Sequence, residues 1–392
     1  ALRSDRSLPQ RHREVMRSAD VIVLGAGIVG AACAESLAVA GLDVLVCERS
    51  IPAGRATAAG MGHVLVLDDS EAQLAITCAG RDLWRARDFP AAVDVDRCGT
   101  LWVATDDEEM AAARSRRTWF ADRGVASEVI DAPMLRELEP ELAHDLVGAL
   151  LVPDDLVVYP PTATTALLGN ARVHGARIQR DARATEVARG RVRLHDGTDL
   201  HAGHVVVALG LDARDLIYAP GVNPPHLIAK KGHLVISDRA SGFLRHQLVE
   251  LGYLKSAHGS ATRSVAFNAQ PRVSGQVLLG SSRQVNVDDD LIDFDLLAEM
   301  LDRGFRFLPR LRELPALRTW VGHRPTTPDN LPLIGPLTGD PQTILAVGHE
   351  GVGITTSLST AQLVTELILA RTPSFDPTAF APDRDFAAEA HG

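Results

Sequence analysis

Three glycines near the N-terminus have the spacing of a phosphate-binding turn. The sequence GAGIVG occupies residues 25–30, between the apolar run 20–24 and an alanine-rich segment that we expect to form a helix. In such a turn the first glycine permits the tight bend, the second lets a pyrophosphate approach the backbone, and the third lets helix and strand pack closely. The free N–H groups of the helix then face the phosphates. The sequence therefore predicts a dinucleotide-binding βαβ unit.

A carboxylate and a small-residue segment narrow the choice of dinucleotide. Glu48 follows the apolar run 43–47, which we expect to be the second strand. Its carboxylate can accept hydrogen bonds from ribose hydroxyls and would repel the 2′-phosphate of NADP. Residues 51–63 are small and glycine-rich, so they can lie flat against a ring system. This favours a flavin over NAD, and a flexible loop is the alternative reading.

A second glycine-rich turn, residues 348–357, precedes a predicted helix that ends near residue 370. The N-terminus of a helix carries a partial positive charge. Reduced flavin carries negative charge at its pyrimidine end, so this turn could lie beside it. An ordinary strand-to-helix turn is the alternative.

The remaining pattern predicts two interleaved domains. Strands expected at 184–187, 192–194 and 204–208, with a turn at 195–197, return the chain to the first βαβ unit. Residues 226–318 contain several strand-like runs and a predicted helix at 295–307, as in an antiparallel sheet with a covering helix.

Composition excludes several classes of protein. The 392 residues are 46% hydrophobic and 23% charged, which is ordinary for a globular chain. The net charge of −10 argues against a nucleic-acid partner. Four cysteines without a CxxC spacing give no iron–sulfur or zinc site, so we expect no metal in this chain. Aromatic residues make up only 4%, which leaves Tyr253, Phe267 and Trp320 as the expected rings near a substrate.

Seven segments together resemble the D-amino-acid-oxidase (DAO) family of FAD-dependent oxidoreductases, from residue 20 to about residue 370. They are VIVLGAGIVG (21–30) with Glu48, ATAAGMG (56–62), VVVALG (205–210), KKGH (230–233), LLGSS (278–282), GHRPTTPDNLPLIGP (322–336) and GHEGVGIT (348–355). Within the family the chain looks most like the FAD-binding β subunits of bacterial heteromeric dehydrogenases, such as opine oxidase, D-hydroxyproline dehydrogenase and hydrogen cyanide synthase.

The resemblance implies a mixed α/β fold, in which a Rossmann-like FAD-binding domain of the glutathione-reductase type is interleaved with an antiparallel-sheet substrate domain. It implies non-covalent FAD and hydride transfer to flavin N5 from the CH–NH bond of a carboxylated amine: a D-amino acid, a proline-like imino acid or an opine. Electrons would pass to other dehydrogenase subunits that carry FMN or an iron–sulfur cluster. A stand-alone oxidase that uses oxygen, and a flavin-bearing structural subunit, are the alternatives.

The resemblance also assigns candidate residues. Arg324 of the GxRP motif would hold the substrate carboxylate, since a guanidinium fits a carboxylate bidentately, or it would cap its own turn or pair with Asp329. His63, Tyr253 and Lys231 are weaker catalytic candidates, with structural roles as alternatives. The cofactor is expected to contact the following residues: Gly25, Ala26, Gly27, Ile28, Val29, Gly30, Glu48, Arg49, Ala59, Gly60, Met61, Gly62, Val187, Ala208, Gly210, Gly322, Gly351, Val352, Gly353, Ile354 and Thr355.

These patterns also predict domain ranges and a location. We expect a flexible arm at 1–19 and a C-terminal tail at 376–392. The FAD-binding domain is expected at 20–75, 145–222 and 319–375, and the substrate domain at 76–144 and 223–318. No signal peptide or membrane-spanning run is apparent, so we expect a cytoplasmic protein that reaches a membrane only through partner subunits.

Overall fold

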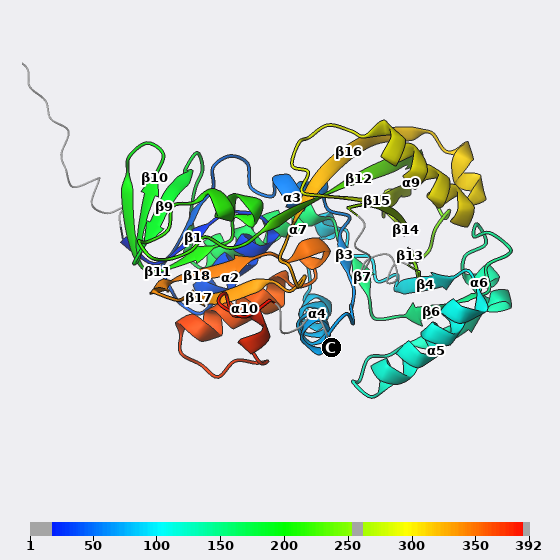
Figure 1. The fold of residues 1–392 in the computed structure, drawn as a ribbon, viewed down its shortest axis with the longest axis horizontal. Coiled ribbons are helices and arrows are strands. Elements are labelled where there is room, and N and C mark those ends of the chain that lie inside the picture. The colour runs from blue at the N-terminus through cyan, green and yellow to red at the C-terminus, as the bar shows by residue number, and fades with distance from the viewer. Residues whose placement is uncertain (1–17, 253–261, 387–392) are drawn as a thin grey trace, which may run out of the picture.

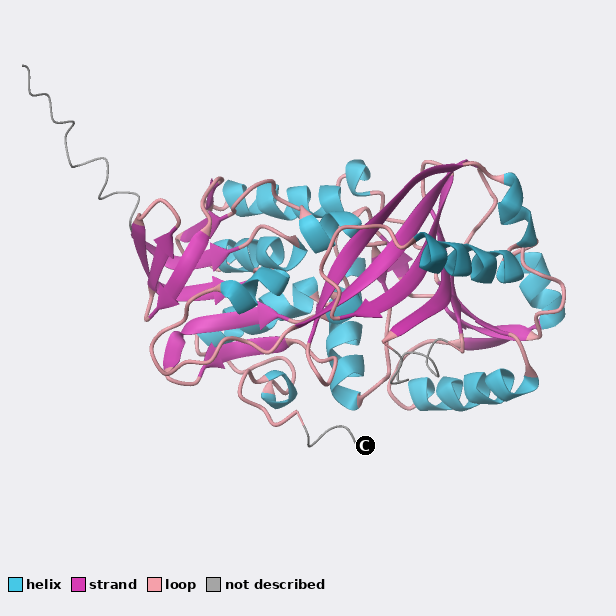
Figure 2. Cartoon of the chain, turned by 45° about the horizontal axis from the view of Figure 1, so that its top comes forward, coloured by secondary structure: helices cyan, strands magenta, loops and turns pink. Residues whose placement is uncertain are grey.

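The computed structural model describes residues 18–252 and 262–386, which form two lobes side by side, each built on an eight-stranded sheet (Figure 1). The first sheet lies on the left of Figure 1 and the second on the right. Figure 2 distinguishes helices from strands by colour and shows the same two lobes from a second direction. In the described part of the chain, no helix has the length and apolar character that a membrane crossing requires.

The first sheet has the strand order β17-β18-β11-β1-β2-β8, and the β9–β10 hairpin extends from β11. Neighbouring strands from β18 to β8 are parallel. Residues 21–24 are all buried, as expected for a parallel strand covered on both faces. The strands are β1 (Ser18–Leu24), β2 (Val44–Cys47), β8 (Arg177–Gln179), β9 (Ala184–Ala188), β10 (Arg191–Leu194), β11 (Asp199–Val207), β17 (Leu333–Leu337) and β18 (Asp340–Val347).

Four helices complete the first lobe: α2 (Ile28–Val39), α4 (Glu71–Arg85), α7 (Pro160–Val173) and α10 (Ser357–Ile368). Helix α2 packs against both α7 and α10, and its small alanine side chains permit this close approach. Helix α4 packs on α10. Its fully buried Trp84 donates the indole N–H to the carbonyl of Ile354 at 2.9 Å, which ties α4 to the segment before α10.

The second sheet has the strand order β16-β12-β15-β14-β13-β4-β6-β5, and its neighbours are antiparallel except for β13 and β4. Helix α9 (Phe294–Phe307) packs on β14 and β15. The strands are β4 (Thr100–Ala104), β5 (Glu128–Asp131), β6 (Gly148–Val152), β12 (Ile228–Arg239), β13 (Gln247–Glu250), β14 (Arg263–Pro271), β15 (Gln276–Val285) and β16 (Ala316–Thr326).

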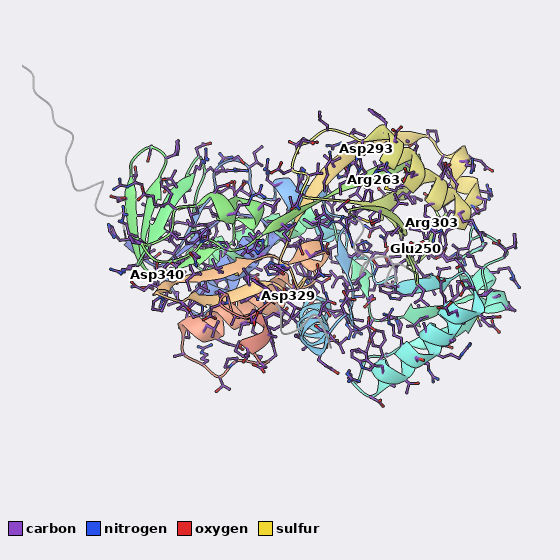
Figure 3. All side chains as sticks on the ribbon, viewed as in Figure 1. Glu250, Arg263, Asp293, Arg303, Asp329 and Asp340 are labelled. Atoms are coloured by element: carbon purple, nitrogen blue, oxygen red, sulfur yellow. The ribbon has the colours of Figure 1, made fainter. Side chains whose placement is uncertain are left out.

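Charged side chains fasten α9 to this sheet (Figure 3). Arg303 on α9 lies 2.7 Å from the Glu250 carboxylate at the end of β13. At the other end of the helix, the Asp293 carboxylate caps α9 by accepting the N–H of Leu296 at 3.0 Å. The ion pair to β13 therefore holds α9 over β14 and β15, and the cap stabilises the first turn of the helix.

The remaining elements are short or peripheral. They are α3 (Arg55–Ala59), α5 (Asp107–Ala121), α6 (Ala132–Leu138), the two-stranded sheet of β3 (His63–Val64) and β7 (Leu156–Val157), and the 3-10 turns at Ala91–Val93, Gly210–Asp215, Pro309–Glu313, Glu350–Val352 and Thr378–Phe380. Asp106 caps α5, since its side chain accepts the N–H of Glu109. The segment 51–63, for which a flexible loop is the alternative reading, contains α3.

The two sheets divide the chain differently from the predicted ranges. Helix α4 was expected in the substrate domain beyond residue 75, yet it packs on the first lobe. Strands β6 and β16 were expected wholly or largely in the FAD-binding domain, yet both pair within the second sheet. The reason is that pairing and packing partners lie far away in the sequence, so composition does not mark where the chain crosses between lobes.

Candidate functional site

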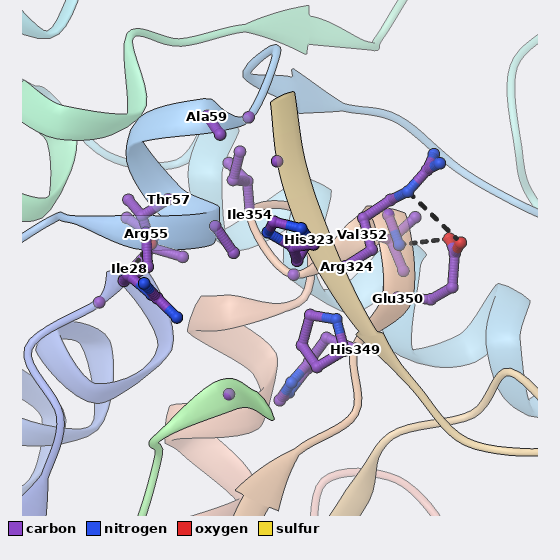
Figure 4. Close-up of a pocket in the computed structure, with 18 of the residues that line it drawn as sticks. Ile28, Arg55, Thr57, Ala59, His323, Arg324, His349, Glu350, Val352 and Ile354 are labelled. Carbon is purple, nitrogen blue, oxygen red and sulfur yellow. Dashed lines mark hydrogen bonds and ion pairs between the residues drawn. The ribbon is translucent and has the colours of Figure 1, made fainter. Parts of the chain in front are cut away.

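A long cavity lies where the carboxyl ends of four parallel strands meet the second sheet. Gly25, Glu48, Ala208 and Gly348 follow β1, β2, β11 and β18, and all four line this cavity. Ligands of open α/β sheets bind outside the carboxyl ends of the strands. The opposite wall comes from β12 and β16, which contribute Gly232 and Gly322 among other residues. Figure 4 shows this region in close-up.

The glycine-rich turn has the close contacts that its sequence predicts. Gly25 has a φ of +98°, and a Cβ added there would lie 2.6 Å from the carbonyl oxygen of Ala208. A Cβ at Gly30 would lie 2.0 Å from the carbonyl oxygen of Gly25. At Gly27, by contrast, an added Cβ would meet only the Thr57 hydroxyl within 4 Å. The first and third glycines therefore serve packing, and the second leaves backbone open to the cavity.

Glu48 accepts hydrogen bonds from the backbone of two loops, the one after β1 and the one after β2. One carboxylate oxygen accepts the N–H of Ala26 at 2.8 Å, and the other accepts the N–H of Ser50 at 2.9 Å. Beside it, the Arg49 guanidinium lies 2.9 Å from the Asp212 carboxylate. A fixed carboxylate at the rim of the cavity suits the hydroxyls of a ribose.

The N-terminus of α2 faces the same cavity. Thr57 of α3 accepts the N–H of Ile28 at 3.1 Å, so α3 packs directly against this helix end (Figure 4). Ile28 and Val29 both line the cavity. On the far side of α3, a Cβ at Gly322 would lie 2.6 Å from the Ala59 side chain, so β16 approaches α3 closely.

These features fit FAD. A cradle of backbone at Gly27, a helix N-terminus beside it, and a carboxylate at the end of β2 suit the pyrophosphate and ribose of an adenine dinucleotide. The cavity then continues between α3 and the second sheet, where small residues leave room for a flat ring.

Arg324 lies on the β16 wall of the cavity (Figure 4). In the sheet register it is directly opposite Lys230 of β12. Its Nη2 donates to the carbonyl oxygen of Ser282 at 2.7 Å, and 22% of the side chain is exposed. The alternative pairing with Asp329 does not form, because Asp329 pairs with Arg384 at 2.7 Å. The guanidinium is therefore held in place with donors left over.

Glu350 is a charged cavity residue that sequence reasoning did not select. Its Oε1 lies 3.9 Å from Arg324 Nε and 3.8 Å from Lys230 Nζ. Burial alone would raise its pKa, but the charges of Arg324, Lys230 and Arg283 outweigh burial and hold the pKa below the ordinary value. Oε1 is buried without a hydrogen-bond partner among the described residues, so it can accept a donor from a ligand.

Two histidines of the site are neutral. His63 lines the cavity, and burial lowers its pKa to about 4, with an opposing contribution from the hydrogen bond to Gln247. His349 also lines the cavity, and burial lowers its pKa to about 3. Both imidazoles can serve as hydrogen-bonding groups, and neither carries charge near neutral pH.

Lys231 does not lie on the cavity face, contrary to the expectation. Successive residues of a strand face opposite sides of the sheet. Lys230 and Gly232 share the face of Arg324 and Gly322, so Lys231 faces the other side, where its Nζ lies 2.6 Å from the Asp289 carboxylate. A difference of one residue decides which lysine is near the site.

The cavity includes most, but not all, of the predicted residues. Those that line it are Gly25, Gly27, Ile28, Val29, Glu48, Arg49, Ala59, Gly60, Met61, Gly62, His63, Ala208, Gly210, Gly322, Arg324, Gly351, Val352, Gly353 and Ile354. Ala26, Gly30, Val187 and Thr355 do not line it, because each is packed inside the first lobe. Tyr253 lies outside the described residues.

The expected aromatic residues differ from those found. Phe267 is fully buried and stacks on Phe307 at a centroid distance of 4.4 Å in the core beneath α9. Trp320 packs beside α3 and donates its indole N–H to the carbonyl of Ala59 at 3.3 Å. Among the described residues, the tryptophan that lines the cavity is Trp102 of β4. Sequence reasoning missed it because its partner in the sheet, Val249 of β13, lies far away in the sequence.

Comparison with known proteins agrees with this geometry. The model of the DAO family, described as FAD dependent oxidoreductase, matches residues 20–367. The hydrogen cyanide synthase subunit HcnC of Pseudomonas aeruginosa is 26% identical, over 94% of this chain and 96% of that protein. The glycine oxidase of the same organism is 24% identical, over 92% of this chain and 98% of that protein.

Solved structures show the same fold. The glycine oxidase of Geobacillus kaustophilus superposes with a TM-score of 0.84 at 22% identity, over 94% of this chain and 99% of that one. The L-proline dehydrogenase of P. horikoshii also has a TM-score of 0.84 at 22% identity, over 93% of this chain and 97% of that one. The predicted family and fold class are confirmed.

Proposed function

Because the chain belongs to the DAO family of FAD-dependent oxidoreductases, we propose that it oxidises the CH–NH bond of a carboxylated amine. The substrate classes are a D-amino acid, a proline-like imino acid or an opine. The observation that carries this proposal is Arg324, a guanidinium fixed in the wall of the cofactor cavity with donors to spare.

Arg324 would bind the substrate carboxylate. Its bond to Ser282 uses one N–H of Nη2, so both N–H groups of Nη1 and the second of Nη2 remain for a bidentate contact. Such a contact orients the Cα–H bond and accounts for much of the rate enhancement through positioning. When FAD is bound, without a covalent link to the chain, it would supply a two-electron acceptor at its N5 atom.

Apolar walls would keep water from the reacting atoms. Leu65, Trp102, Leu234 and Val249 line the cavity and come from both lobes. Excluding water strengthens the contacts to charged groups inside the site. The imine product would then hydrolyse after release.

We further propose that the electrons leave through partner subunits that carry FMN or an iron–sulfur cluster. The similarity to a protein named as a subunit of hydrogen cyanide synthase supports this. The assembly would work in the cytoplasm and meet a membrane only through those partners. A stand-alone oxidase is the second candidate, supported by the similarity to proteins named glycine oxidase. Stoichiometric peroxide formation by the isolated chain in air would favour the oxidase.

The test is flavin bleaching without oxygen. FAD-loaded protein is mixed anaerobically with a panel of D-amino acids, proline-like imino acids and opines. Arg324→Met is expected to slow reduction by the active amine at least about 100-fold, since two charge-assisted hydrogen bonds are lost. Arg318→Met, on the exposed part of the same strand, is the control and should change nothing.

Two outcomes contradict the proposal. If no carboxylated amine bleaches the flavin, with or without co-purified partners, the substrate class is wrong. If Arg324→Met reduces at the rate of the unaltered protein, Arg324 does not bind the substrate. The first of these outcomes would favour the alternative of a flavin-bearing structural subunit.

A further inference from the structure

A line of buried hydrogen bonds leads from the cavity into the second lobe. His63 Nδ1 lies 2.6 Å from Gln247 Oε1, Gln247 Nε2 lies 2.6 Å from Thr100 Oγ1, and Thr100 Oγ1 lies 2.6 Å from Asp155 Oδ2. Gln247 and Thr100 are register partners on the parallel strands β13 and β4. Gln247, Thr100 and Asp155 are all fully buried, and we call these three residues the buried chain.

The hydrogen bonds of the buried chain all run in one direction, because each bond fixes which group donates in the next. A threonine hydroxyl has a single proton. When Thr100 accepts from the Gln247 amide nitrogen, its own proton is free to bond the Asp155 carboxylate. The amide oxygen of Gln247 is then left to accept, so His63 must carry its proton on Nδ1.

This tautomer leaves His63 Nε2 without a proton. Nε2 lies 3.3 Å from Met61 Sδ, and a thioether has no proton to donate. Both residues line the cavity, and methionine side chains move readily. The Nε2 lone pair is therefore available to a donor that enters the cavity and displaces the Met61 side chain.

Protonation of Asp155 would reverse every bond. The carboxylic acid would donate to Thr100, Thr100 would donate to the turned amide of Gln247, and that amide would donate to His63 Nδ1. The imidazole proton would then lie on Nε2, where it could bond Met61 Sδ. The buried chain thus has two states, and the charge of Asp155 selects between them.

The surroundings of Asp155 place this change near neutral pH. Burial raises the pKa of its carboxyl to about 7, although the hydrogen bond from Thr100 and the charge of Arg81 both act to lower it. Arg81 Nη1 lies 3.8 Å from Asp155 Oδ1, and neither atom has a hydrogen-bond partner within the described residues. Arg81 also pairs with Asp82 at 3.0 Å, so Asp155 shares its charge with a second carboxylate. The other titratable groups around Asp155 include Asp154, Cys78 of α4 and Cys98 ahead of β4.

His63 itself stays neutral through this range. Burial lowers its pKa to about 4, and the nearby positive charge of Arg272 acts in the same direction. A pH change around neutrality therefore moves the proton between the two ring nitrogens and does not charge the ring.

We propose that the buried chain positions the proton of His63, so that its Nε2 accepts a hydrogen bond from the N–H of the substrate amine while Asp155 is ionised. This inference rests on the proposed function for the identity of the donor. His63 and Arg324 line the same cavity. The inference requires that one molecule be held by its carboxylate at Arg324 and by its nitrogen at His63. His63 is then a substrate-contacting residue, and the buried chain consists of positioning residues.

The test compares Thr100→Val with Thr100→Ser in the FAD-loaded protein. Valine fills the same space without a hydroxyl, whereas serine keeps the hydroxyl. Nitrogen NMR of ¹⁵N-histidine-labelled protein reports which ring nitrogen of His63 carries the proton, with His63→Gln used to assign its signals. The unaltered protein and Thr100→Ser should show bare Nε2 well above pH 7 and protonated Nε2 well below it. Thr100→Val should show a mixture that does not change with pH.

Substrate turnover provides a second readout. Anaerobic flavin reduction by the active amine should fall below about pH 7 in the unaltered protein and in Thr100→Ser. In Thr100→Val the rate of flavin reduction should not depend on pH in this range. Above about pH 7 it should be about 10-fold lower than in the unaltered protein, which is the equivalent of one hydrogen bond. Asp155→Asn, which has nothing to titrate, should also lose the step and covers the case in which Thr100→Val does not fold.

The proposal is overturned if the His63 tautomer of the unaltered protein does not change around pH 7, or if the change persists in Thr100→Val or Asp155→Asn. The NMR measurement needs no amine, so it decides the role of the buried chain even if no amine reduces the flavin. A failure of every amine to reduce the flavin would count against the proposed function alone.

Discussion

Replacing Gly30 by alanine should both destabilise the first lobe and weaken FAD binding. An alanine Cβ at this position would lie 2.0 Å from the carbonyl oxygen of Gly25 and 3.3 Å from the Ala208 side chain. The obstacle at Gly25 is backbone, so no side-chain rotation can relieve it. Helix α2 must move away from β1 by about 1 Å or the turn must open.

The magnitude follows from two opposing contributions. Overpacking of this kind costs about 1–3 kcal/mol. Alanine is favoured over glycine inside a helix by up to about 1 kcal/mol. We therefore expect a net destabilisation of about 1–2 kcal/mol. The shift also moves the N-terminus of α2 away from the pyrophosphate, so the Kd for FAD should rise at least about 10-fold.

The assay titrates apoprotein with FAD by flavin fluorescence and follows unfolding in urea. Gly169→Ala is the matched control, because Gly169 is an exposed residue of α7 whose added Cβ would meet nothing within 4 Å. It should be neutral or slightly stabilising, with unchanged FAD affinity. If Gly30→Ala binds FAD and unfolds like the unaltered protein, the close contact of helix and strand does not shape the site.

Two further predictions concern stability and pH. Arg384→Ala should cost about 3–5 kcal/mol in urea unfolding, because it leaves the buried Asp329 carboxylate without an opposite charge. Arg310→Ala is the control, because the Arg310 side chain that pairs with Glu141 is 61% exposed, and it should change nothing measurable. Burial would raise the pKa of Asp329, but the charge of Arg384 outweighs burial and holds the pKa below the ordinary value. The difference in unfolding free energy between the unaltered protein and Arg384→Ala should therefore shrink as pH falls through that lowered pKa. Burial lowers the pKa of His349 from 6.5 to about 3, so the folded protein takes up fewer protons than the unfolded chain in that interval and should lose stability as pH falls from 6.5. His349→Asn should flatten the dependence of the urea midpoint on pH, and an unchanged slope would show that His349 does not titrate as expected.

Local patterns in the sequence were enough to predict the dinucleotide site. The turn at residues 25–30, Glu48 after β2 and the glycine-rich segments around 60 and 351 all line the cavity or pack its walls. Each depends on residues close together in the sequence, or on the fixed geometry of a βαβ unit, in which strand, turn and helix follow one another directly. The arginine of the GxRP motif also lies in the cavity wall as predicted.

The tertiary structure alone decided which side chains meet across the two lobes. Side chains alternate along a strand, so a single residue separates Lys230, which faces Arg324, from Lys231, which faces Asp289. Trp102 enters the cavity, and Thr100 meets Gln247, only because β4 pairs with a strand almost 150 residues later in the chain. Such pairings come from long-range sheet register and packing, which no local pattern records. The sequence alone therefore predicted the glycine-rich turns and the carboxylate on one side of the cavity, and the folded sheets determined which side chains form its other wall.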